Sequence, residues 1–144
     1  MNNNDTIKLL CECDAGLKMG VTAIDEVMGG AKSDKMRQKL CEFKSEHETL
    51  KGETETELVK MGADIKEPSV MAKGMSWIKT NMQMAMDESD KTIANIMTDG
   101  CNMGIKNLNK YLNEYSEADS GARGIAKRLI NLEERMTQEM SRYL

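Results

Sequence analysis

The sequence predicts an all-α fold of four long helices and one shorter helix, and three observations support this. The chain of 144 residues contains one proline, and fourteen methionines supply much of its apolar content. Long unbranched side chains and a near absence of proline favour helix. Apolar residues recur at a spacing of three and four, and no segment shows the alternation of a strand bounded by turns.

The first predicted helix covers residues 5–28, with Asn4 or Asp5 as its N-cap and Gly29-Gly30 at its end. One position of its apolar seam is an aspartate, Asp14. The other seam positions are Ile7, Leu10, Leu17, Val21, Ile24 and Met28.

The second predicted helix covers residues 34–61, with Ser33 or Asp34 as its N-cap and Gly62 at its end. The only histidine of the chain, His47, falls on its apolar seam. The remaining seam positions are Met36, Leu40, Phe43, Leu50 and Met61, with Thr54 and Glu57 or Leu58 between them.

A shorter helix is expected over residues 69–86, because Pro68 suits the position before its first turn. Its apolar residues are numerous for a short helix, so an uncovered part would form a surface for a partner protein or a second copy. The residues of this possible surface are Met71, Met75, Trp77, Met82 and Met86.

Two more helices are predicted over residues 90–115, capped by Ser89, and 119–143. Only a few residues join 5–28 to 34–61 and 90–115 to 119–143, so each of these two pairs is predicted to form an antiparallel hairpin. The helix 69–86 would then cross from one end of the bundle to the other. The whole chain, 1–144, is expected to form one domain.

The sequence also contains an internal repeat. Gly16-x-x-Met19-Gly20 recurs 84 residues later as Gly100-x-x-Met103-Gly104. Glycine inside a helix costs about 1 kcal/mol relative to alanine, so glycines at matched places predict close helix approach. By the same offset Asp14 corresponds to Thr98. A weaker echo between the second and the last helix aligns His47 with Met136.

Asp14 and His47 are equally far from a turn centred on Gly30-Ala31, and both are seam positions. Residues equidistant from the turn of an antiparallel hairpin share a layer. We therefore expect the carboxylate of Asp14 and the imidazole of His47 to meet in the core.

The helix order, the crossover and the repeat resemble the ferritin-like superfamily, and within it an uncharacterised bacterial branch of single-domain proteins. This resemblance implies a di-metal site built from one carboxylate on each of two helices and Glu-x-x-His on each of the other two. The corresponding segments here are Lys44-Ser45-Glu46-His47 and Glu133-Glu134-Arg135-Met136. The ligand set that survives is Asp14, His47, Glu133 and Asp99.

Lys44 would place a positive charge where a divalent cation should lie, which argues against a metal. We therefore predict a metal-free polar cluster in the core, with Asp14 beside His47 and Lys44 paired with Glu133.

The function that matches this cluster is a non-catalytic interaction or stress-associated module without a cofactor. The alternative is an iron- or manganese-binding oxidase or storage protein that uses Asp14, His47 and Glu133. A third reading is an apolar ligand between the hairpins, near Gly100 and Gly104.

Composition limits the other functions. The net charge is −4 and the basic residues are spread along the chain, so no nucleic acid is expected as a partner. No apolar run reaches the length of a membrane span, and the N-terminus lacks a secretion signal, which predicts a cytoplasmic protein. The four cysteines show no zinc spacing, and no catalytic motif of a known enzyme class is present.

Overall fold

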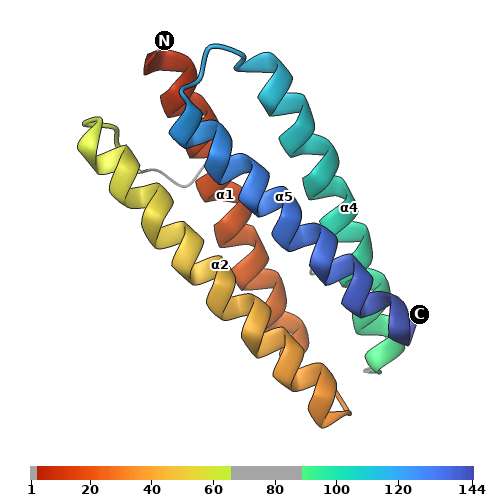
Figure 1. Cartoon of the computed structure of the whole chain (residues 1–144). Helices are drawn as coiled ribbons and strands as arrows, with labels where there is room; N and C mark the ends of the chain where they lie inside the picture. The colour runs from red at the N-terminus through yellow and green to blue at the C-terminus, as the bar shows by residue number, and fades with distance from the viewer. Residues whose placement is uncertain (1–2, 66–88) are drawn as a thin grey trace.

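The computed structural model describes residues 3–65 and 89–144, and in these ranges the chain is helical. The helices are α1 (Asn3–Met28), α2 (Asp34–Lys60), α4 (Asp90–Glu114) and α5 (Ser120–Met140), followed by the short 3-10 helix η1 (Ser141–Tyr143). They lie side by side as a bundle (Figure 1). No strand occurs in the described ranges, which confirms the all-α class. The expected helix 69–86, with the surface residues Met71, Met75, Trp77, Met82 and Met86, lies outside the described residues.

Side-chain caps fix where three of the helices begin. Each cap is an oxygen that accepts the backbone N–H three residues further on, which satisfies one of the free donors of the first turn. The pairs are Ser33 with Met36 at 3.0 Å, Ser89 with Thr92 at 3.2 Å and Asp119 with Ala122 at 2.8 Å. At the other end of α2, Gly62 adopts φ +69°, the left-handed conformation that glycine accepts most easily.

The core follows the predicted seam closely in α2 but not in α1. Leu9, Cys13 and Val27 are also buried in α1, beside the predicted seam. The reason is that α1 packs against all three of the other long helices, whereas α2 packs mainly against α1 and α5. A helix with neighbours on several sides must be apolar over a wider arc.

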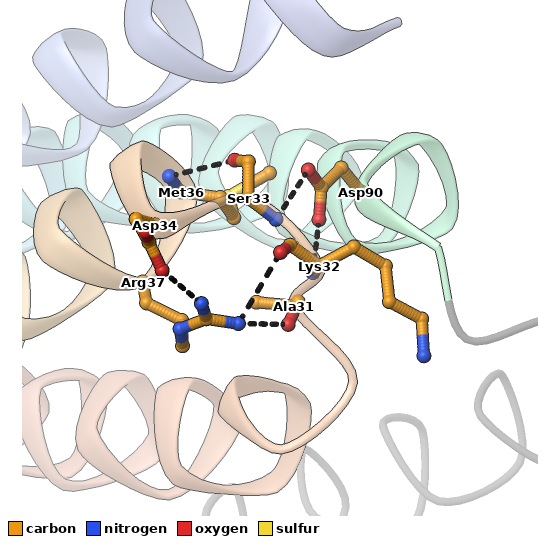
Figure 2. A network of polar contacts seen from close by, with 7 residues as sticks. All are labelled: Ala31, Lys32, Ser33, Asp34, Met36, Arg37 and Asp90. Atoms are coloured by element: carbon orange, nitrogen blue, oxygen red, sulfur yellow. Dashed lines mark hydrogen bonds and ion pairs between the residues drawn. The ribbon is translucent and has the colours of Figure 1, made fainter.

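One end of the bundle is held by Asp90, at the start of α4. Its carboxylate accepts the backbone N–H groups of Lys32 and Ser33 at 2.7 Å and 3.1 Å, in the turn between α1 and α2 (Figure 2). These hydrogen bonds lower the pKa of Asp90, although its partial burial acts in the opposite direction. Arg37 supports the same turn by donating to the carbonyl oxygen of Ala31 at 2.7 Å.

The other end is held in the same way by the start of α1. Asp5 accepts the backbone N–H of Glu117 at 3.0 Å, and Thr6 accepts that of Asp119 at 2.9 Å. The predicted N-cap role of Asn4 or Asp5 is therefore wrong, since α1 begins at Asn3 and Asp5 binds the distant turn. Asp90 follows Asp5 by 85 residues, close to the offset of the sequence repeat.

The described helices contain no segment long and apolar enough to cross a membrane.

Candidate binding groove

A groove runs between α1 and α4 and is bordered by glycine on both helices. Four glycines line it, and a missing side chain at each of these places leaves room between the helices. They are Gly16 and Gly20 in α1, and Gly100 and Gly104 in α4. The groove is narrow and partly open to solvent, and its free volume for the centre of a water-sized molecule is about 80 Å³. A groove near Gly100 and Gly104 is the one that the third reading of the sequence requires.

The floor of the groove carries two ionisable side chains, His47 from α2 and Glu133 from α5. Surface ion pairs show how these two helices are aligned. The pairs are Lys39 with Glu139 at 3.9 Å, Glu46 with Arg135 at 2.9 Å and Glu53 with Arg128 at 2.7 Å. The residue number in α5 falls as the residue number in α2 rises, so these two helices run in opposite directions. By this alignment His47 and Glu133 lie at nearly the same level of the bundle.

His47 is 1% exposed and fills the space that Gly20 leaves open. A Cβ atom at position 20 would lie 2.6 Å from Nε2 of this ring. Nδ1 lies 2.7 Å from the carbonyl oxygen of Phe43, so Nδ1 carries the proton and donates it. Burial lowers the pKa of His47, with the Phe43 carbonyl acting in the opposite direction. The imidazole is therefore neutral at pH 7, with the lone pair on Nε2.

Glu133 is 8% exposed and lies against Gly104, where a Cβ atom would be 2.7 Å from Oε1. Its Oε2 atom is buried and has no hydrogen-bond partner. Burial raises the pKa of Glu133 from 4.5 to about 8, since little offsets the loss of water around the charged form. Glu133 is therefore a neutral carboxylic acid at pH 7.

The walls of the groove are mainly apolar, and methionines from both helices contribute to them. The apolar lining residues are Met19, Ala23, Ile96, Met97, Cys101, Met103, Leu108, Leu129 and Met136. Glu12 and Tyr111 also line the groove. Burial, followed by the charge of Glu12, raises the pKa of Tyr111 to about 12.

Asp14 is buried, as predicted, but its partner is different. Its Oδ2 atom is 2.9 Å from Nζ of Lys18, one turn further along α1, and Lys18 also lies 3.5 Å from Glu55. Burial raises the pKa of Asp14 to about 6, and the Lys18 ammonium limits this rise. The predicted contact of Asp14 with His47 is not formed, because the imidazole packs at Gly20 instead.

Lys44 does not enter the core. Its Nζ atom is 2.7 Å from Asp25 and 4.0 Å from Glu48, both of which are exposed. The predicted pair with Glu133 is therefore wrong. A long side chain one turn from His47 leaves the helix on its outer flank and reaches the nearest carboxylate in solvent.

The predicted metal ligands are not brought together. Asp14 is bound to Lys18, and Asp99 is exposed on α4. Of the set, only His47 and Glu133 line the same groove. Among residues 3–65 and 89–144, no three side chains of His, Cys, Asp or Glu are grouped so that they could hold one metal ion.

Sequence reasoning missed that the two glycines accommodate His47 and Glu133. Gly20 and Gly104 occupy matching places in the repeat, so the signal was present. We expected them to bring helix backbones together, whereas each admits a polar side chain from the neighbouring helix.

Comparison of the chain with protein-family models, with curated proteins and with solved structures finds no match. Function must therefore be argued from the groove itself.

Proposed function

We propose that this chain is a non-catalytic binding protein whose working part is the groove between α1 and α4. We propose further that it has the connectivity of the ferritin-like bundles, with two antiparallel hairpins and a di-metal site that has been lost. Its four cysteines are free, which fits a reducing compartment such as the cytoplasm. The ligand is a small molecule with an apolar body and one polar group.

The observation that carries this proposal is the unpartnered oxygen of Glu133. A buried polar atom without a partner costs about 1–3 kcal/mol, and folded proteins contain few of them. Here the atom belongs to a side chain on the floor of an apolar groove, where a bound ligand would supply the missing partner. Apolar walls with a few polar groups at the bottom are the usual form of a small-molecule site.

The iron or manganese alternative has less support. The groove brings only His47 and Glu133 to one place, and oxygen- and nitrogen-bound metals in proteins normally use more ligands than two. Asp14 is bound to Lys18 instead.

The proposal is tested with octanol as the probe and with methionine methyl groups as reporters in NMR spectra. Octanol should shift the methyl signals of Met19, Met97, Met103 and Met136, which line the groove. The methyl signals of Met36 and Met140 should stay in place, because these two residues are buried elsewhere in the core.

A pair of glycine variants provides the control. Gly16→Leu puts a side chain into the groove and should weaken octanol binding at least tenfold. Gly124→Leu has free space around its Cβ atom and lies outside the groove, so it should leave binding unchanged. Octanol shifts spread over all methionines, or binding that survives Gly16→Leu, would overturn the proposal.

A further inference from the structure

When Glu133 is ionised, the ligand of this groove must supply hydrogen-bond donors. Nε2 of His47 carries a lone pair, because Nδ1 donates to the carbonyl oxygen of Phe43. Oε2 of Glu133 has no partner, and a carboxylate can only accept. The two acceptors come from helices aligned so that both lie at one level, below the gap that the glycines leave.

The charge of the groove selects further among donors. Its described lining includes the acidic side chains Glu12 and Glu133 and contains no lysine or arginine. An anionic ligand would be repelled by the ionised carboxylate of Glu133. A neutral ligand would gain no electrostatic attraction from it. A primary ammonium group has three donors and one positive charge, which matches both features.

We infer that the groove binds a linear aliphatic amine, with its ammonium group on Oε2 of Glu133 and Nε2 of His47 and its alkyl chain between α1 and α4. This inference rests on the proposed function, since it names the ligand class of the same groove. Met19 and Met103 flank the alkyl chain, and flexible thioether side chains adapt well to such a chain.

Binding of an ammonium group requires the ionised form of Glu133. The groups that face this carboxyl from the other helices are His47 of α2, Cys13 of α1 and Cys101 of α4. Burial raises the pKa of both thiols and lowers that of His47, so all three are neutral at pH 7 to pH 8. One proton, from Glu133, is released as the amine binds, and affinity rises with pH up to about 8.

The experiment compares octylamine, octanol and octanoate, which share one chain length and differ in the head group. Calorimetry at pH 8 should give octylamine at least a tenfold tighter binding than octanol, and octanoate the weakest. Between pH 7 and pH 8 the affinity for octylamine should rise by about fivefold, while that for octanol stays constant.

Glu133→Gln keeps the shape of the side chain and removes its charge. It should reduce the preference for octylamine over octanol to less than threefold and abolish the pH dependence of octylamine binding. The matched control, Glu134→Gln, changes the exposed neighbour and should alter neither quantity.

The outcomes separate the two proposals. If octanol binds in the groove and octylamine binds no more tightly, the amine inference is wrong and the binding function stands. If octanoate binds best, the inference is wrong as well. If none of the three shifts the groove methionines, both proposals fail.

Discussion

The two halves of the molecule use the same device for opposite chemistry. In the first half, α1 and α2, Gly20 makes room for His47, a base. In the second half, α4 and α5, Gly104 makes room for Glu133, an acid. The base is held by the carbonyl oxygen of Phe43, whereas the acid keeps an oxygen without a partner. The difference teaches that matching backbones do not imply matching roles.

The largest expected effect comes from Glu133. Between pH 4.5 and about 8 the folded chain keeps a proton on Glu133 that the unfolded chain has lost, so this group lowers stability as pH rises. At about 1.4 kcal/mol per pH unit, the loss reaches about 5 kcal/mol above pH 8. Glu133→Gln should therefore match the parent in unfolding free energy near pH 4.5 and exceed it by several kcal/mol at pH 8.5, measured by urea denaturation.

Exposed Glu134 is the control for this comparison, and Glu134→Gln should change stability by less than about 0.5 kcal/mol at either pH. A difference between Glu133→Gln and the parent that does not depend on pH would show that Glu133 is ionised in the folded state.

Alanine at the two glycines gives the next largest effect. At Gly20 the new Cβ atom would lie 2.5 Å from Cδ2 of a rigid ring that Phe43 holds in place. Overpacking of this kind costs about 1–3 kcal/mol, so Gly20→Ala should lower the thermal midpoint clearly. Gly104→Ala should cost less, because the end of the Glu133 side chain can rotate away.

Gly16→Ala is the reference for both variants. Its Cβ atom would be 3.7 Å from Leu129, which is ordinary contact, so the helix should gain up to about 1 kcal/mol from the better helix former. Equal midpoints for Gly20→Ala and Gly16→Ala would contradict the close packing of His47.

The smallest effect concerns the other buried carboxyl, Asp14, which has a partner where Glu133 has none. Lys18→Met removes that partner and should cost about 1–3 kcal/mol at pH 8, where Asp14 is ionised. The cost should shrink at pH 5, because the pKa of Asp14 is about 6 even with Lys18 present. Lys44→Met, at the exposed pair with Asp25, should change the unfolding transition little at either pH.

Much of the fold follows from local patterns in the sequence. The seam of α2 and the caps Ser33 and Ser89 depend on helix periodicity and on side chains that bind their own first turn. The burial of Asp14 and His47 was also predictable, since both are seam positions.

The partners of these residues were not predictable from position alone. A hairpin centred on Gly30-Ala31 pairs Asp14 with His47. In the structure His47 contacts Gly20, so the centre of the α1–α2 pairing lies nearer to Ser33. A shift of this size moves a residue by more than one turn. Lys44 shows a second limit of prediction from sequence position. Its long side chain can reach several carboxylates, and it pairs with Asp25, which is exposed to solvent.

The contacts at the two ends of the bundle bear on how ligands enter. Asp90 holds one turn through two backbone amides, and Asp5 and Thr6 hold the other through two more. A slide of one half along the other by a single helical turn, about 5.4 Å, would break all four hydrogen bonds together. A ligand therefore does not enter by such a slide, whereas bowing of α1 and α4 at their glycines would widen the groove and leave both ends closed.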